Sequence, residues 1–347
     1  MTYSISDAFA LLGGLGLFIY GMKVMSDALQ KSAGSSLRMI LRKMTSNTFM
    51  GVMTGFIVTA LLQSSSATTV MVVSFVNAGL LNLAESMGVI MGANVGTTIT
   101  AWIVSILGFK VKISAFALPI IGVSFGLMFI PNKKWKNVGE IAIGFGLLFI
   151  GLSFLKDSVP DIQQNPQILS FIEAYTHSGI WSVILFVFIG FVLTVVVQSS
   201  SASLAITLVM VAQGWIDFKM AAAMFLGGNV GTTITALLAA LIGNIHAKRA
   251  ALFHCVFNVL GVVWVMLILD EFLMVIDQII VWLFGHSTLG QTQSAEDTTI
   301  ALSIFHTVFN VLNTLVFIWF IPQLEKWVVK IMPSTDEDDE QTYLKYL

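Results

Sequence analysis

The sequence predicts an all-α polytopic membrane protein with two inverted repeats, each containing a re-entrant helical hairpin, plus an extra C-terminal helical segment. Three observations predict this fold. The chain of 347 residues is 56% hydrophobic and only 10% charged, whereas about a quarter of residues are charged in soluble domains. Several apolar runs reach the roughly 20 residues that span a bilayer as a helix. Finally, one polar motif occurs twice, at Gln63 and Gln198, which are 198 − 63 = 135 residues apart.

Composition also excludes several classes of protein. No basic cluster with interleaved aromatic residues indicates nucleic-acid binding. Cys255 is the only cysteine, so an internal disulfide and a cysteine metal cluster are both excluded. We therefore expect a multi-pass protein of the plasma (inner) membrane, whose surroundings are the lipid bilayer and which carries no organic cofactor.

The first repeat is expected over residues 8–130. It begins with a glycine-rich apolar run, Leu11–Met25, which suits a membrane helix that packs closely on a neighbour. A hairpin is expected at about 48–82, because the run from Gly51 to Ala84 has no charged residue or histidine and Gln63-Ser64-Ser65-Ser66 interrupts it. The arms on either side are too short to span a bilayer, so we place the serines at the tip. The alternative is one long helix whose serines bond back to the preceding turn.

The next span carries a glycine–asparagine run, and another span follows at residues 113–130. Glycines flanking an asparagine weaken a helix, so an unwound or closely approached backbone is expected here. The run reads Gly92-Ala93-Asn94-Val95-Gly96-Thr97-Thr98-Ile99-Thr100.

The second repeat is expected over residues 138–269, with its hairpin at about 181–216. It carries Gln198-Ser199-Ser200-Ser201 and a second glycine–asparagine run, in which Gly228 replaces Ala93. Each repeat contains three crossings and a hairpin that returns to its own side. Three is odd, so the second repeat is expected to be inverted, with the two hairpins entering from opposite faces and their tips meeting at mid-membrane.

Additional membrane helices are expected over residues 270–330, followed by an acidic tail at 333–347. Whether residues 271–284 span the bilayer or lie at its interface is left open. A His–Asn pair four residues apart occurs twice, as His254 with Asn258 and as His306 with Asn310. Such polar side chains commonly bridge membrane helices, so a packing role is expected for both histidines.

The two tips suit an anion and a cation together. The helices that begin near Ala67 and Ala202 present unpaired N–H groups and a positive partial charge. Serine hydroxyls and glutamine amides can donate hydrogen bonds, while their oxygens can ligate a hard cation. Neither hairpin contains Lys or Arg, so a bound anion needs a co-bound cation to balance its charge. The groups therefore favour a cation-coupled anion transporter, although a sodium site alone or a neutral polar solute would use the same inventory.

Hydrolysis is the competing use of serine. A serine nucleophile needs a neighbouring base, and His254 is the best candidate. The sequence has no Gly-x-Ser-x-Gly elbow and no evident carboxylate to orient that histidine. We therefore expect a protein that is not an enzyme.

The paired Gln-Ser-Ser-Ser and Gly-x-Asn-Val-Gly-Thr-Thr motifs resemble those of the type II sodium-dependent phosphate cotransporter family, including its bacterial branch. The resemblance implies transport of inorganic phosphate with sodium by an elevator-like movement. It implies phosphate binding by Ser64, Ser65, Ser66, Ser199, Ser200 and Ser201. It implies sodium binding by Gln198, Ser199, Ser200, Thr232 and Thr235, and by pseudo-symmetry at Gln63, Ser64, Thr97 and Thr100. Supporting roles are implied for Asn94, Asn229, His254 and Asn258.

Several points stay open at this stage. The alternatives to phosphate are another small oxyanion or a carboxylate, and the alternative to coupled transport is a passive anion channel. Positive-inside counting places Lys133–Lys136 in the cytoplasm, whereas the resemblance implies the opposite face. Sodium stoichiometry, the direction of transport and assembly into a homo-oligomer are also left open.

Overall fold

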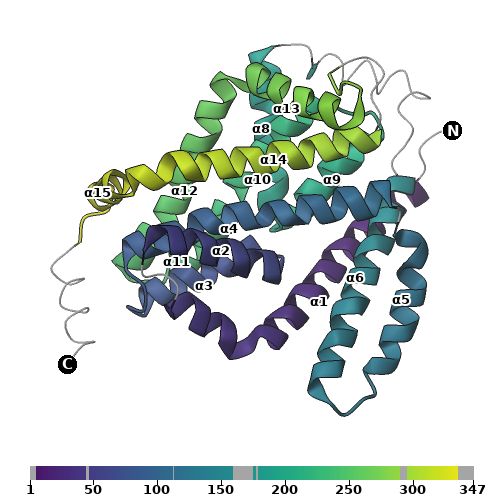
Figure 1. The fold of residues 1–347 in the computed structure, drawn as a ribbon, viewed down its shortest axis with the longest axis horizontal. Coiled ribbons are helices and arrows are strands. Elements are labelled where there is room, and N and C mark those ends of the chain that lie inside the picture. Colours follow the sequence, from purple (N-terminus) through teal and green to yellow (C-terminus); the bar gives the residue numbers. More distant parts are fainter. Residues whose placement is uncertain are drawn as a thin grey trace. The chain divides into compact units, whose positions relative to one another are not determined.

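In the computed structural model, the regular secondary structure of the described residues is all helical (Figure 1). The described residues are 5–43, 47–111, 113–158, 175–176, 179–289 and 295–334, with the backbone alone for 34–43. His177 and the acidic residues Asp336–Glu340 lie outside these ranges. Within them, seven helical segments are long and apolar enough to cross a membrane. These are Ile5–Ala33, Leu83–Lys110, Lys133–Ser158, Ile180–Val197, Phe218–Ala240, Ile245–Leu267 and Glu296–Ile331. The prediction of a multi-pass, all-α membrane protein is therefore confirmed.

The helices of the described residues have the following bounds. In chain order they are α1 (Ile5–Lys43), α2 (Thr48–Leu62), α3 (Ser65–Asn77), α4 (Leu83–Ile103), the π-helical turn η1 (Val104–Lys110), α5 (Ser114–Leu127), α6 (Lys133–Ser158), α8 (Ile180–Val197), α9 (Ser200–Ala212), α10 (Phe218–Gly231), α11 (Thr233–Ala240), α12 (Ile245–Leu267), α13 (Leu269–Phe284), α14 (Ala295–Phe317), the 3₁₀ turn η3 (Ile318–Phe320) and α15 (Ile321–Ile331).

The chain divides into two compact units. Unit 1 comprises residues 1–34, 98–231 and 264–309, and unit 2 comprises residues 35–97, 232–263 and 310–347. Unit 2 contains the first Gln-Ser-Ser-Ser motif with α2 and α3, and unit 1 contains the second with α8 and α9. Each unit therefore holds one of the two Gln-Ser-Ser-Ser motifs.

Glycines bring the backbones of neighbouring helices into direct contact around both motifs. At four of them a Cβ atom would stand about 2 Å from a carbonyl oxygen of the adjacent helix, far inside van der Waals contact. The pairs are Gly55 with Val89 O (2.0 Å) and Gly92 with Val52 O (1.9 Å) in unit 2, and Gly190 with Met224 O (2.1 Å) and Gly227 with Val187 O (1.8 Å) in unit 1. Each unit 1 residue stands 135 positions after its unit 2 counterpart, so the same packing occurs in both units.

The expectation for the glycine–asparagine runs is met by close approach. α4 is helical without interruption from Leu83 to Ile103, so the first run is not unwound. In the second run α10 ends at Gly231 and α11 begins at Thr233, but Thr232 between them keeps helical dihedral angles (φ −62°, ψ −24°). Neither run is therefore unwound.

Glycines also pack α1 against α6 in unit 1. A Cβ at Gly21 would lie 2.7 Å from Gly144 O, and a Cβ at Gly144 would lie 2.7 Å from Gly21 O. Gly14 and Gly151 contact one another in the same reciprocal way. The residue numbers rise along α1 while they fall along α6, so the two helices are antiparallel. Small residues that let backbones approach closely are typical of such membrane interfaces.

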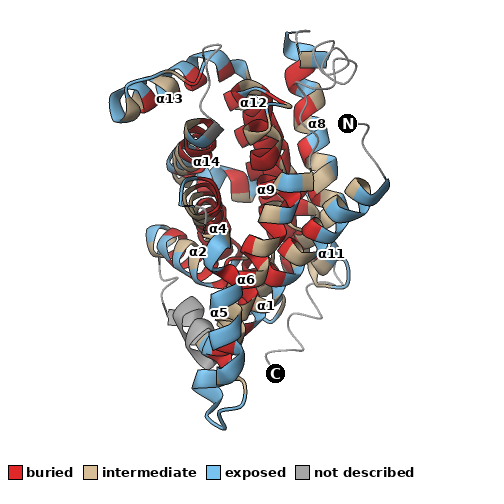
Figure 2. Ribbon diagram, turned by 90° about the vertical axis from the view of Figure 1, so that its right-hand side faces the viewer, coloured by how far each residue is buried: buried red, intermediate tan, exposed pale blue. Residues whose placement is uncertain are grey.

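Burial separates helices that face the surroundings from helices of the core (Figure 2). In α5 the buried residues are Ala117 and Ser124, and its exposed side chains include Leu118, Val123 and Phe125. Exposed apolar side chains of this kind suit contact with lipid tails. In α9, by contrast, most residues from Ser201 to Val211 are buried. α9, which begins within the second Gln-Ser-Ser-Ser motif, is therefore a core element of unit 1.

Candidate functional site: two serine-capped helix breaks

The first Gln-Ser-Ser-Ser motif forms a break between α2 and α3. α2 ends at Gln63, whose backbone is left-handed (φ 53°, ψ 29°) and whose N–H donates to Thr59 O. Ser64 then takes an extended conformation, and its Oγ accepts from the N–H of Ala67 at 3.1 Å. This is an N-cap, which satisfies one of the orphan donors at the start of α3. One continuous helix, the alternative to a break at this motif, is therefore not formed.

The second motif repeats this geometry in unit 1. Gln198 has φ 55° and ψ 25°, and Ser199 Oγ accepts from the N–H of Ala202 at 3.2 Å. Among the described residues, Gln63 and Gln198 are the only non-glycine residues with positive φ. This conformation costs an L-residue about 1–2 kcal/mol. Such strained positions cluster at functional sites, which singles out the two glutamines without reference to their sequence motif.

Each glutamine side chain also caps the helix that it ends. The amide Nε2 of Gln63 donates to Ala60 O at 2.6 Å, and that of Gln198 donates to Val195 O at 2.6 Å. These bonds satisfy carbonyls that lack an intrahelical partner at a helix C-terminus. An amide whose nitrogen is used in this way still carries an acceptor oxygen, the atom that a hard cation requires.

The serines predicted to bind phosphate lie at the starts of α3 and α9. Ser65 and Ser201 are buried, and the other four, Ser64, Ser66, Ser199 and Ser200, are half-buried. Each helix start also presents backbone N–H groups without a carbonyl partner in the same helix. The first three serines belong to unit 2 and the last three to unit 1.

The predicted sodium ligands are also divided between the units. Unit 1 holds Gln198, Ser199, Ser200 and Thr100, and unit 2 holds Thr232, Thr235, Gln63, Ser64 and Thr97. Thr235 Oγ1 donates to Thr232 O at 2.8 Å, at the boundary between α10 and α11. Thr97 Oγ1 instead donates to Ala93 O at 3.1 Å within the continuous α4. The two threonine pairs, though similar in sequence, therefore have different backbone surroundings.

Both asparagines of the glycine–asparagine runs are buried and find partners on the His–Asn helices. In unit 2, Asn94 Nδ2 donates to Asn258 Oδ1 at 3.0 Å, and Asn258 Nδ2 donates to His254 O at 2.9 Å. In unit 1, Asn229 Oδ1 lies 3.2 Å from His306 Nε2. The two copies of the His–Asn motif thus contact the two asparagines through different residues, Asn258 in the first copy and His306 in the second. The His306 ring bridges helices as expected, whereas the buried ring nitrogens of His254 have no hydrogen-bond partner. Sequence reasoning had not linked His306 with Asn229, although the repetition of both motifs was the available signal.

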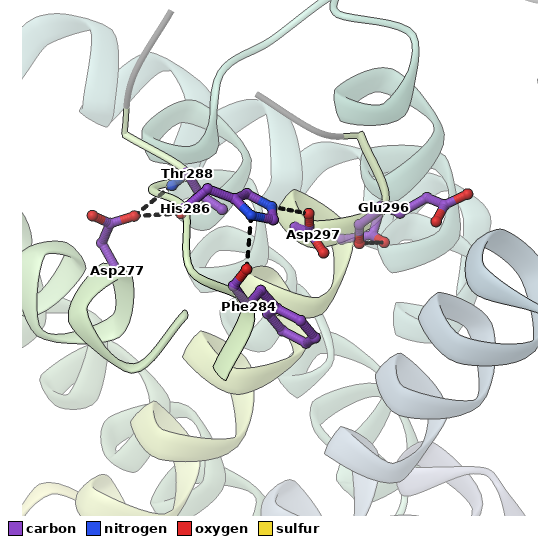
Figure 3. A network of polar contacts seen from close by, with 7 residues as sticks. Asp277, Phe284, His286, Thr288, Glu296 and Asp297 are labelled. Carbon is purple, nitrogen blue, oxygen red and sulfur yellow. Dashed lines mark hydrogen bonds and ion pairs between the residues drawn. The ribbon is translucent and has the colours of Figure 1, made fainter. Parts of the chain in front are cut away.

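A separate polar network joins α13 to the start of α14 in unit 1 (Figure 3). His286 bonds to the Asp297 carboxylate and to Phe284 O, and the hydrogen bond with Asp297 raises the pKa of His286. Burial would raise the pKa of Asp277, but hydrogen bonds from Ser287, Thr288 and Leu289 outweigh it and lower that pKa. Sequence analysis assigns no role to His286, and these hydrogen bonds connect the residues after α13 to α13 and to the start of α14.

Comparison with known proteins then identifies the family. Residues 17–157 and 167–313 match the sequence model of the Na+/Pi-cotransporter family. The uncharacterized protein YqeW of Bacillus subtilis is 31% identical over 306 residues, which cover 87% of this chain and 90% of that protein. The putative inorganic phosphate export protein YjbB of Escherichia coli is 27% identical over 342 residues, which are 97% of this chain but only 58% of that protein.

A third relative is the sodium-dependent phosphate transport protein 2A of Rattus norvegicus, 38% identical over 99 residues, which are 28% of this chain and 16% of that protein. No solved structure matches. The family match covers most of the chain and both helix breaks, and it confirms a membrane transporter rather than a hydrolase. The protein is a member of the Na+/Pi-cotransporter family.

Proposed function

We propose that the protein is a secondary active transporter that couples sodium entry to the movement of inorganic phosphate across the plasma membrane. Family membership supports phosphate as substrate, and two of the relatives carry phosphate transport or export in their names. Phosphate is bound by the serines of both tips, and the hairpin-bearing helices then move relative to a scaffold by an elevator-like mechanism.

The observation that carries this proposal is the shared geometry of the two helix breaks. In each, a left-handed glutamine is followed by a serine N-cap. The cap uses the serine oxygen as an acceptor, so its hydroxyl hydrogen is left to donate to an anion. The amides of Ser65 and Ser200 begin their helices and add donors together with the positive end of the helix dipole.

Sodium is needed to balance the charge of the bound phosphate. The two breaks offer phosphate hydrogen-bond donors but no Lys or Arg, since the uncharged runs extend from Gly51 to Ala84 and from Ile180 to Ile216. An anion transferred alone to such a site would be strongly disfavoured. The hydroxyl and amide oxygens of the same segments supply ligands for a hard cation, including the glutamines and threonines assigned to sodium.

The packing of α1 on α6 supports the proposed inversion of the repeats, with repeats at 8–130 and 138–269 and added helices at 270–330. Gly14 and Gly21 are the counterparts of Gly144 and Gly151 at an offset of 130 in the sequence. In contact, however, Gly14 pairs with Gly151 and Gly21 with Gly144. Equivalent helices that exchange partners in this way, running antiparallel, have the pattern that a local two-fold axis produces. That is the relation expected between inverted repeats.

Uptake of radiolabelled phosphate into proteoliposomes tests the function. We expect accumulation above equilibrium with an inward sodium gradient and none with an equal potassium gradient. Because the E. coli relative is named as a putative exporter, efflux from preloaded vesicles should be measured in parallel. Equal rates with both cations, from protein shown to be folded, would exclude sodium coupling. Dissipation of a phosphate gradient without accumulation would indicate the passive channel instead.

Competition identifies the substrate. Excess arsenate should inhibit labelled phosphate uptake, because it shares the shape and charge of phosphate. Sulfate and succinate should inhibit weakly or not at all. Strong inhibition by succinate or sulfate would favour the alternative of another oxyanion or a carboxylate.

A further inference from the structure

The two helix breaks differ one helical turn away from their tips. In unit 2, Thr59 Oγ1 donates to Thr68 Oγ1 at 3.0 Å, which joins the end of α2 to the start of α3. The residues at the same positions in unit 1 are Thr194 and Ser203. Thr194 is only 2% exposed, and its Oγ1 has no hydrogen-bond partner. Among the described Ser and Thr residues, it is the one fully buried hydroxyl oxygen left unpaired.

The neighbour of Thr194 on α10 is also different. Gly228 occupies the position that Ala93 holds in the first repeat. A Cβ atom at Gly228 would stand 3.3 Å from Thr194 Oγ1 and 4.0 Å from Ser203 Oγ, and it would meet nothing else within 4 Å. An alanine methyl group here would crowd the Thr194 hydroxyl, whereas Gly228 leaves the volume beside the two hydroxyl oxygens without a side chain. Ser203 is itself 3% exposed, so this volume lies inside unit 1.

An unpaired hydroxyl in the interior is unfavourable, because it has lost its hydrogen bonds to water without replacement. A water molecule needs polar partners and little more than its own volume to occupy such a place. A sodium ion seeks the same neutral oxygen ligands as other hard cations. Thr194 is four residues before Gln198, and Ser203 is four residues after Ser199. One helical turn on each side therefore connects this volume to the tip.

We propose that Thr194, Ser203 and the gap at Gly228 form a binding site for one water-sized species held by hydroxyl oxygens, either a sodium ion or a water molecule. The first repeat has no counterpart, because its two hydroxyls bond to one another. The sodium alternative rests on the proposed function, whereas the site itself does not.

A double-mutant cycle tests the site on the purified full-length protein, with thermal unfolding measured in the absence of phosphate. Gly228→Ala places a methyl group where the bound species would be. With Thr194 present, it should lower the Tm by about 2–4 °C, because the hydroxyl loses its partner. In the background of Thr194→Val, where no hydroxyl is left to lose a partner, the same change should lower the Tm by less. An identical shift of the Tm in both backgrounds would overturn the proposal, since the effect of the alanine would then not depend on the Thr194 hydroxyl.

The first repeat supplies the matched control. The cycle of Ala93→Gly with Thr59→Val should show no coupling, because the Thr59 hydroxyl already has its partner in Thr68. Coupling as large as that in the second repeat would mean that the effect is general to threonine beside this helix, and would overturn the assignment to Gly228.

Comparing equal concentrations of sodium and potassium chloride distinguishes the two occupants. If sodium is bound, the wild-type Tm is higher in sodium, and Gly228→Ala removes part of that difference. If water is bound, the coupling is the same in both salts. Neither result depends on phosphate transport, so failure of the site and failure of the proposed function remain separate outcomes.

Discussion

The two helix breaks have the same backbone conformation, but the residues packed around them differ. At the first, Gln63 is 7% exposed, the Thr59 and Thr68 hydroxyls bond across the break, and α4 runs unbroken beside it. At the second, Gln198 is exposed and Thr194 has no partner. A left-handed glutamine and a serine N-cap are local devices, so the same four residues form the same break twice. Whether the polar groups near each break find hydrogen-bond partners depends instead on the helices that pack against it.

The largest expected effect tests whether the packing is equivalent at both breaks. Gly92→Ala and Gly227→Ala each place a Cβ within 2 Å of a carbonyl oxygen. Each should destabilise by about 3 kcal/mol or more, because backbone cannot yield as a side chain can. The measurement is the fraction of detergent-extracted protein that elutes as a folded species.

Gly13→Ala and Gly16→Ala are the matched controls, since a Cβ at either meets nothing within 4 Å. They should be neutral or slightly stabilising, as alanine favours a helix over glycine. If the Gly227→Ala variant folds normally and the Gly92→Ala variant does not, the two breaks are not packed alike.

Transport is expected to need both breaks equally. Ser65→Ala and Ser200→Ala should each abolish phosphate uptake while the protein still inserts and unfolds cooperatively, because each removes a donor at a helix start. Ser74→Ala is the control, since that hydroxyl is exposed and bonds to Val70 O within α3. Normal uptake by both variants would remove the breaks from the mechanism. Loss of uptake in only one of the two variants would place phosphate binding at a single break.

Sodium dependence should separate the repeats. Thr232→Val should raise the sodium concentration for half-maximal uptake about tenfold, which corresponds to the loss of about 1.4 kcal/mol of binding. Thr97→Val should have a smaller effect, since α4 is continuous there and its hydroxyl donates to Ala93 O. The measurement is uptake at saturating phosphate. A larger effect at Thr97, or a change in phosphate affinity alone, would contradict the assignment of Thr232 to sodium.

The smallest effect concerns the loop of Figure 3, which belongs to unit 1 alone. The pKa of His286 is raised, so its contribution to stability is complete below the ordinary value of about 6.5 and is lost as the pH rises through the raised pKa. The pKa of Asp277 is lowered, so its contribution is lost only on acidification below its ordinary value.

Hydrogen exchange should therefore show α13 and the start of α14 losing protection as the pH is raised from about 6 to 9, after correction for intrinsic exchange. In unit 2, α2 and α3 serve as the reference. His286→Gln should remove the pH dependence. An equal loss in α2 and α3 would mean that the change is global and does not arise at His286.

The sequence by itself determined the membrane class, the position of each helix break and the glycines of close approach. These follow from composition and short-range patterns: long apolar runs, a serine that caps a helix, and small residues at fixed spacing. The matching of Gly55 and Gly92 by Gly190 and Gly227 could be read from the offset of 135 alone.

Only the tertiary structure decided which residue of the His–Asn motifs each asparagine contacts and whether α4 is continuous. It also decided whether a threonine hydroxyl near each break has a hydrogen-bond partner. Asn94 and its partner Asn258 are 164 residues apart in the sequence, and Asn229 and His306 are 77 apart. No local pattern selects between such partners. Where two repeats share a motif, local hydrogen bonds fix the shape of the break, and long-range packing decides which polar atoms are left to bind something else.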